Sequence, residues 1–270
     1  MNLPAAVLLG IIQGLTEFLP VSSSAHLILA RAFFGWEAPP ELGLAFDVAL
    51  HIGTLAAIVT FFHADVMAMV RAAPQALSNT PSAPGRLAQM IVIGTLPIVV
   101  VGLLMTDAVE EALRQPAVAA GALTVGAIAM LLAERLGERT RDEHGIRWTE
   151  AILIGCAQAA ALVPGMSRSG STIAMGLFLG VRRDAAARFT FLLAIPATLA
   201  AASKEGLEVA QMTLGRDVLV LFAVGMVVSA VVGYVTIKYF LRFLARHRLD
   251  LFAWYRLALA ALTVVWLWRH

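Results

Sequence analysis

A serine-rich break interrupts the first apolar segment of the chain. Residues 13–26 read QGLTEFLPVSSSAH, and the break that begins at Pro20 separates apolar residues 4–19 from apolar residues 25–35. Each apolar half is shorter than the roughly 20 residues that a helix needs to cross a bilayer. Irregular backbone at membrane depth is tolerated only where protein or a wet cavity surrounds it. The stretch therefore predicts a re-entrant helix–loop–helix element.

A second segment repeats this pattern. Residues 164–170 read PGMSRSG and separate apolar residues 150–163 from 171–181. Before each break stands a tetrapeptide that begins with Gly and ends with Gln, Gly10–Gln13 in one case and Gly155–Gln158 in the other. A proline and a cluster of serines follow in both. We expect two re-entrant elements related by an internal repeat.

The composition places both elements in a membrane protein. Hydrophobic residues make up 60% of the 270 residues and charged residues 14%, against about 45–50% and 25% in soluble domains. This excludes a cytosolic globular enzyme, a disordered chain and a disulfide-stapled secreted domain. No basic run with interleaved aromatic residues occurs, so we expect no nucleic-acid partner.

The longer apolar runs predict an all-α fold with six transmembrane helices and the two re-entrant elements. The predicted spans are residues 44–62, 87–105, 117–134, 185–203, 218–238 and 251–268. They follow the order re-entrant element, three spans, re-entrant element, three spans, within a single membrane domain covering residues 1–270. Because three is an odd number, the halves, about 1–147 and 148–270, should have opposite orientations, as in an inverted repeat.

The distribution of cations predicts the orientation. Most arginines and lysines, including those of 135–147, 182–188 and 238–248, fall on one side, which the positive-inside rule assigns to the cytoplasm. Both termini then lie outside, and the tips of the two re-entrant elements meet near the midplane. We expect a site that opens outward, with Arg168 and Arg256 at membrane depth.

The two breaks carry polar groups that suit phosphate chemistry. The first supplies Gln13, Glu17, Ser23 and His26, and Gln13 and Glu17 share one helix face. The second supplies one guanidinium, several hydroxyls and a half-helix N-terminus, a typical anion site; its candidate phosphate-binding residues are Arg168, Ser167, Ser169 and Thr172. Together they favour phosphoryl transfer on a lipid-linked substrate.

Simpler structural roles stay open for several of these residues. Arg168 could be an ion-pair partner of Glu17, and serines beside a helix break often cap backbone groups. His51, four residues after Asp47, is interpreted as an interhelical hydrogen-bonding residue. The aromatic residues near the end of the chain predict interface anchors in contact with membrane lipids: Trp254, Tyr255, Trp266 and Trp268.

Two long motifs resemble those of a known family. Residues 13–26 and 164–172 are similar to the two signatures of the undecaprenyl-diphosphate phosphatases, the bacitracin-resistance family, and the likeness covers essentially the whole chain. The resemblance implies a multi-pass enzyme of the bacterial cytoplasmic (inner) membrane. It would hydrolyse undecaprenyl diphosphate to undecaprenyl phosphate and inorganic phosphate, which recycles the carrier for peptidoglycan synthesis and confers bacitracin resistance.

The resemblance also implies roles for single residues. Catalysis falls on Glu17, Ser23, His26 and Arg168, with a divalent metal, Mg²⁺ or Ca²⁺, held by Glu17 and Gln13. Gln13 replaces a carboxylate found in many members, and Ala25 replaces a common glycine. Glu17 should therefore dominate metal binding or base action, because a neutral amide is a weaker ligand for a hard cation.

The sequence leaves three questions open. The nucleophile is Ser23 activated by Glu17 or His26, His26 itself, or a metal-bound water, and we favour Ser23 with assistance from His26. The alternative function is a transporter or flippase of the polyprenyl phosphate carrier, because paired broken helices are common in transporters. A homodimer stays one option for the assembly.

Overall fold

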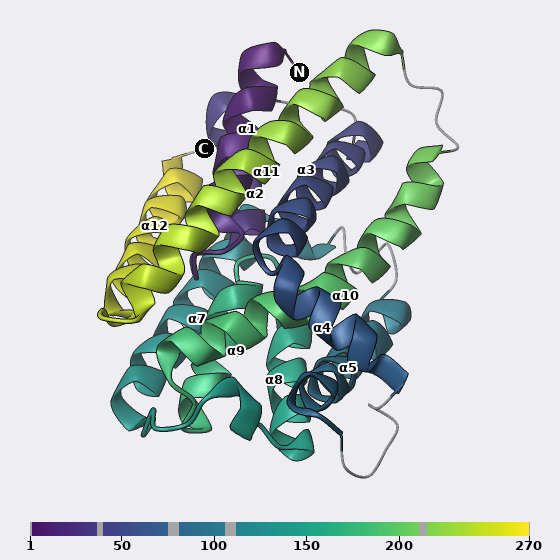
Figure 1. Cartoon of the computed structure of the whole chain (residues 1–270). Helices are drawn as coiled ribbons and strands as arrows, with labels where there is room; N and C mark the ends of the chain where they lie inside the picture. Colours follow the sequence, from purple (N-terminus) through teal and green to yellow (C-terminus); the bar gives the residue numbers. More distant parts are fainter. Residues whose placement is uncertain (1, 37–39, 75–80, 106–111, 211–214, 270) are drawn as a thin grey trace.

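The computed structural model describes residues 2–36, 40–74, 81–105, 112–210 and 215–269. The regular secondary structure of these residues is helical, including a short 3₁₀ turn at Glu143–Gly145, and an isolated bridge pairs Arg141 with Val181. Figure 1 shows the arrangement of α1 (Leu3–Thr16), α2 (Ser23–Phe34), α3 (Pro40–Phe61), α4 (His63–Ala72), α5 (Ala83–Leu104), α7 (Pro116–Leu136), α8 (Trp148–Ala160), α9 (Arg168–Phe178), α10 (Arg183–Ala210), α11 (Arg216–Leu244) and α12 (Asp250–Arg269).

The predicted membrane helices are confirmed. Within the described residues, six helices are long and apolar enough to cross a membrane: α3, α5, α7, α10, α11 and α12. Two helices extend furthest beyond the predicted boundaries: α10, which ends at Ala210, and α11, which ends at Leu244 and has 29 residues. α11 is the longer of the two. At 1.5 Å per residue it is about 44 Å long and exceeds a hydrocarbon core of about 30 Å. The N- and C-termini both lie in the upper part of Figure 1.

Glycines allow the short helices to pack closely on the spans. α1 packs on α11, and α8 packs on α5. A Cβ atom on Gly10 would lie 2.9 Å from the carbonyl oxygen of Gly225, and one on Gly155 would lie 2.3 Å from that of Gly94. Small residues at such crossings let backbones approach each other, which is the main source of helix association in membranes. Each short helix is thereby fixed against a long one.

The two breaks have nearly the same backbone conformation. Ser22 precedes α2 with φ 73° and ψ 99°, and Ser167 precedes α9 with φ 69° and ψ 112°. These positive φ values are strained for residues other than glycine. Each serine offsets the strain by capping the following helix: Ser22 Oγ accepts from Ala25 N–H at 3.4 Å and Ser167 Oγ from Gly170 N–H at 3.1 Å. Both breaks therefore have a defined backbone conformation that the local sequence stabilises.

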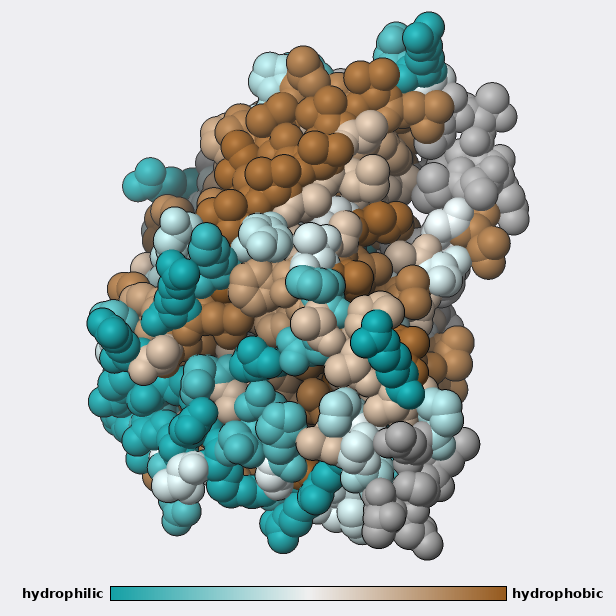
Figure 2. Space-filling view, viewed as in Figure 1, coloured by the Kyte–Doolittle hydropathy of each residue, from teal (hydrophilic) through white to brown (hydrophobic). Residues whose placement is uncertain are grey.

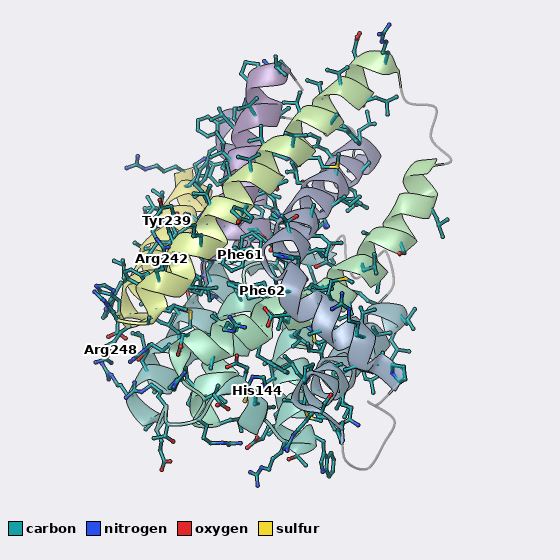
Figure 3. The ribbon with its side chains drawn as sticks, viewed as in Figure 1. Phe61, Phe62, His144, Tyr239, Arg242 and Arg248 are labelled. Atoms are coloured by element: carbon teal, nitrogen blue, oxygen red, sulfur yellow. The ribbon has the colours of Figure 1, made fainter. Side chains whose placement is uncertain are left out.

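One end of the molecule is charged. Hydrophilic residues gather over the lower part of Figure 2, and apolar residues cover the upper part over α11. Arg242 and Arg248 lie near the turn that joins α11 to α12 at this end (Figure 3). Beneath them, the fully buried Glu134 carboxylate accepts from Arg183 Nε at 2.7 Å and from Leu249 N–H at 2.9 Å. This carboxylate ties α7 to α10 and to the start of α12.

A second charge cluster fixes the start of α8. The Glu150 carboxylate accepts hydrogen bonds from both Nη atoms of Arg141, at 2.8 and 2.9 Å, and from the backbone N–H of Arg147 at 2.8 Å. The bonds from Arg141 are the main reason that the pKa of Glu150 falls to about 2. Glu150 lies outside the six spans, in the first turn of α8.

Replacing Glu150 with Gln should lower the melting temperature at pH 7 by about 3 °C or more. The pKa of an unfolded glutamate is about 4.3, so the ionised native carboxylate stabilises the fold above that pH. This stabilisation is lost as the pH falls toward 2. In thermal unfolding of detergent-solubilised protein, the difference in melting temperature between native and Glu150→Gln protein should become smaller from pH 7 to pH 3. The same substitution at the exposed Glu138 is the control. A difference in melting temperature that does not depend on pH would contradict the stabilising role of the ionised Glu150 carboxylate.

Candidate active site

A cavity of about 390 Å³ lies where the two breaks meet. Its polar floor is formed by Glu17 and Ser23 from the first break, His51 from α3, Arg168 from α9 and Thr198 from α10. Its wall is apolar, with side chains of α2, α3, α5 and α10: Leu27, Ile28, Val48, Ile98, Val99, Leu103 and Ala197. The cavity thus joins a small charged centre to a surface that suits a hydrocarbon chain.

The Glu17 carboxylate is the centre of the floor. Its Oε2 accepts from Ser23 Oγ at 2.6 Å and from Gln13 Nε2 at 3.1 Å. Its Oε1 accepts from Arg168 Nη2, which joins the two breaks by an ion pair. The structure therefore brings together Gln13, Glu17, Ser23 and Arg168, as the sequence predicts.

The Arg168 guanidinium is held from two sides. Besides the bond to Glu17, its Nη1 donates to Thr198 Oγ1 at 2.7 Å. Arg168 is the first residue of α9, so its charge stands beside the free N–H groups of a helix N-terminus. An anion entering the cavity would meet a guanidinium and a helix terminus, and would compete with Glu17 for the guanidinium.

His51 faces the site, a position that the sequence interpretation as an interhelical hydrogen-bonding residue missed. Its Nδ1 lies 2.8 Å from the carbonyl oxygen of Asp47, so Nδ1 carries the proton, and Nε2 lies 3.7 Å from Glu17 Oε2. The signal in the sequence was a pair of polar residues four apart within a span. The spacing of these two residues does not determine the rotation of α3 about its axis, and it is this rotation that turns His51 toward Glu17.

His26 is placed differently from the prediction. Its Nε2 accepts from the Tyr255 hydroxyl at 2.7 Å, its Nδ1 donates to the carbonyl oxygen of Ser22 at 2.7 Å, and its ring stacks on Tyr255. It is absent from the cavity lining. Both nitrogens are engaged, Nδ1 by the backbone that precedes α2 and Nε2 by Tyr255 of α12. Tyr255, predicted as an interface anchor, has a polar partner within the protein.

The hydroxyls of the second break are largely engaged with the protein. Ser169 Oγ donates to the Leu19 carbonyl oxygen at 3.0 Å, and Thr172 Oγ1 donates to that of Arg168 at 2.7 Å. Of the three predicted phosphate-binding hydroxyls, only that of Ser167 belongs to a residue lining this cavity. Ser169 and Thr172 are buried, and their hydroxyls bond to backbone carbonyls, one in the first break and one in the preceding turn of α9.

Two oxygen donors are available for a metal ion. Gln13 Oε1 is buried without a hydrogen-bond partner, and Nε2 of the same amide donates to Glu17 Oε2; of the two residues, Glu17 lines the cavity. Across the described part of the chain there is no group of three or more His, Cys, Asp or Glu side chains that could hold a metal. Mg²⁺ is commonly held by one or two carboxylates together with substrate phosphates. The residues present fit an ion that the substrate helps to bind.

Charged residues mark one end of the cavity. Asp47 forms a bidentate pair with Arg31, at 2.6 and 3.0 Å, and lies 3.7 Å from Arg114 Nη1. Asp47 and Arg114 both line the cavity. This end lies toward the start of α3 and the start of α7, away from Glu134 and the charged end of the molecule.

Fold and site together define a multi-pass α-helical membrane protein with a cavity, lined by Glu17, Ser23 and Arg168, between two breaks in its helices. The family model described as bacitracin resistance protein BacA matches residues 6–262, and the chain belongs to this family. The Rubrobacter xylanophilus protein named undecaprenyl-diphosphatase is 46% identical over 265 residues, covering 97% of this chain and 97% of its own. The Stutzerimonas stutzeri protein named undecaprenyl-diphosphatase 2 is 43% identical and covers 98% of each.

Inorganic phosphate should bind in this cavity and raise the melting temperature of the protein. Arg168→Ala should abolish the effect, because it removes the cation of the floor. Glu17→Gln should tighten binding by about three- to tenfold, because it removes the carboxylate that competes for Arg168. Thermal shift against phosphate concentration measures both. Arg188→Ala, which removes a guanidinium paired with Asp65 and Glu143, is the control. Unchanged binding by Arg168→Ala would place the anion elsewhere.

Proposed function

We propose that this protein hydrolyses undecaprenyl diphosphate to undecaprenyl phosphate and inorganic phosphate. The observation that carries the proposal is the Ser23–Glu17–Arg168 array at the base of an apolar-walled cavity. Family membership and the names of its relatives support the same activity. In the cell the reaction would recycle the lipid carrier for peptidoglycan synthesis, and the family description agrees with a role in bacitracin resistance.

The geometry supports Ser23 as the nucleophile. Its hydroxyl donates to Glu17 Oε2 at 2.6 Å, so the carboxylate can take the proton as Oγ attacks the terminal phosphorus. The bond from that phosphorus to the bridging oxygen breaks, and the electron pair leaves with undecaprenyl phosphate. Water then attacks the phosphorus of the phosphoserine and the P–Oγ bond breaks. Oγ takes the proton back from Glu17, and the proton that the water loses leaves with inorganic phosphate. Arg168 balances the charge that develops on the phosphoryl oxygens.

A divalent cation, Mg²⁺ or Ca²⁺, forms part of the proposal. Glu17 and Gln13 Oε1 would hold it, and it would neutralise charge on the diphosphate oxygens. His51 stands on the other side of Glu17 Oε2 and lines the cavity, so it can exchange a proton with water there. In this arrangement His51, and not His26, is the histidine within reach of Glu17.

We also propose that the breaks are the tips of re-entrant elements in an inverted repeat, with halves of about 1–147 and 148–270. α1, α2, α8 and α9 have 14, 12, 13 and 11 residues, at most about 21 Å each. The equivalent conformations of Ser22 and Ser167 support the repeat. So does the exchange of partners, in which the short helix of each half packs on a span of the other.

The proposed location is the bacterial inner membrane, with both termini outside and a site that opens outward. The charged end of the molecule would face the cytoplasm under the positive-inside rule. The cavity extends from the breaks toward Asp47 and Arg114, which lie toward the opposite end. Substrate in the outer leaflet would reach it directly.

Purified protein should release phosphate from a polyprenyl diphosphate, and chelation of divalent metal should suppress the release. Ser23→Ala, Glu17→Gln and Arg168→Ala should each lower kcat by about a hundredfold or more, because each removes one member of the array. Ser203→Ala, on the exposed side of α10, is the matched control. Mass spectrometry of rapidly quenched native protein should find phosphate on Ser23; phosphate on a histidine would overturn that assignment.

The transporter alternative predicts a different result in the same preparation. A carrier would move polyprenyl phosphate across a sealed vesicle without releasing phosphate under any metal condition. The paired breaks alone are compatible with both functions. The hydrogen bond from Ser23 to Glu17 distinguishes them, because transport does not require an activated hydroxyl.

A tag at the C-terminus should be digested when protease is added to intact spheroplasts. A tag inserted after Asp142, in the connection between α7 and α8, should be protected, because the proposed orientation places it inside. Immunoblotting of the two tagged proteins measures this. Protection of the C-terminal tag together with digestion of the internal one would reverse the orientation.

A further inference from the structure

Arg256 is a fully buried cation in the middle of α12. Within the described residues, no carboxylate lies in ion-pair range of its guanidinium; Glu134 and Glu17, the buried carboxylates of α7 and the first break, pair with other arginines. An unpaired buried charge is among the most costly features that a protein can contain. The contacts that compensate for it therefore show what this residue does.

Backbone carbonyl groups surround the guanidinium. Nη2 donates to the carbonyl oxygens of Gly165 and Met166, at 2.9 and 3.0 Å, in the second break. Nη1 lies 3.4 Å from the carbonyl oxygen of Pro20 in the first break. Nε donates to Leu123 of α7 at 3.2 Å. Broken helices leave carbonyl groups without helical partners, and Arg256 supplies donors to those of both breaks at once.

Two glycines leave the space that the guanidinium fills. A Cβ atom on Gly126 of α7 would lie 2.0 Å from Nη2, and one on Gly170 of α9 would lie 2.7 Å from Nη1. Neither position could carry a larger residue without moving Arg256. The pocket for this side chain is therefore shaped by three helices, independently of the hydrogen bonds.

The neighbouring residue extends the same contact to α2. The Tyr255 hydroxyl donates to His26 Nε2 at 2.7 Å, and the two rings stack with centroids 5.7 Å apart. His26 is three residues from Ser23 in the first turn of α2. Consecutive residues of α12 thus hold the helix that carries Ser23 and the loops on either side of the site.

We infer that Arg256, assisted by Tyr255, is a positioning residue that sets the separation between Ser23 and Arg168. Among the described residues, two polar contacts join the breaks directly: the Glu17–Arg168 pair, and the bond from Ser169 Oγ to the Leu19 carbonyl oxygen. The first of these must loosen when a phosphate binds Arg168. Arg256 does not line the cavity, so it can keep the breaks together through the reaction. The catalytic consequence rests on the proposed hydrolase function.

Hydrogen–deuterium exchange tests the positioning role without reference to activity. In Arg256→Lys, which keeps the charge but has fewer donors, backbone exchange should accelerate at least about tenfold in the segments around Pro20 and Gly165 only. Gly126→Ala, which displaces the guanidinium without changing a residue of either break, should give the same exchange pattern. It is the variant to use if Arg256→Lys does not fold. Thr263→Val, a buried polar change further along α12, is the matched control.

The kinetic experiment uses the same variants with a polyprenyl diphosphate. Misplacement of Ser23 relative to Arg168 should lower kcat by about ten- to a hundredfold, with KM changed less than about threefold. Tyr255→Phe should give a smaller loss of kcat, since it removes only the bond to His26.

The outcomes test the positioning role of Arg256 separately from the proposed hydrolase function. Exchange that stays unchanged at both breaks, or that accelerates throughout the chain, would overturn the positioning role. The positioning role would also be overturned if a folded Arg256→Lys or Gly126→Ala protein hydrolysed the substrate with the same kcat as native protein. If native protein releases no phosphate, the proposed function fails, and the exchange pattern still decides whether Arg256 fixes the breaks.

Discussion

The ion pair between Glu17 and Arg168 is the interaction on which the rest of the structure depends. It joins residues 151 positions apart in the sequence, which lie at the ends of α1 and α9, helices of 14 and 11 residues. Neither charge could be left alone in an apolar interior, where desolvation of an ion costs several kcal/mol or more. The pairing compensates both charges and brings the two breaks together, and a phosphate that enters replaces one negative partner by another.

The sequence was sufficient to predict the parts of this fold that depend on composition and order. Six spans, two interruptions and the presence of Glu17 and Arg168 at their tips follow from apolar run lengths and from the few charges left at depth. The environments of His51, Tyr255 and Arg256 could not be predicted in the same way. Each lies on a helix whose rotation about its axis is set by packing against segments far away in the sequence. The local pattern of apolar and polar residues carries no information on that packing.

The roles of the break hydroxyls show a second limit. A serine beside a broken helix can bind a ligand or satisfy the backbone, and both roles need the same residue type. In the structure Ser23 faces Glu17, whereas Ser169 and Thr172 bond to carbonyl groups and are buried. His26 points to Tyr255 although only three residues separate it from Ser23. Spacing alone does not distinguish these cases, because the direction of each side chain depends on the turn before the helix.

The matching conformations of Ser22 and Ser167 have an evolutionary consequence. The residue after each of these serines occupies the same place on the same backbone, and it is Ser23 in one half and Arg168 in the other. Five residues before Ser22 and Ser167 stand Glu17 and Leu162, respectively. An ancestral half paired with its own copy would have presented identical groups to each other, two hydroxyls or two like charges. With the roles proposed for Ser23 and Arg168, one backbone conformation would supply an attacking group in one half and a cation in the other, so the two halves would not be interchangeable.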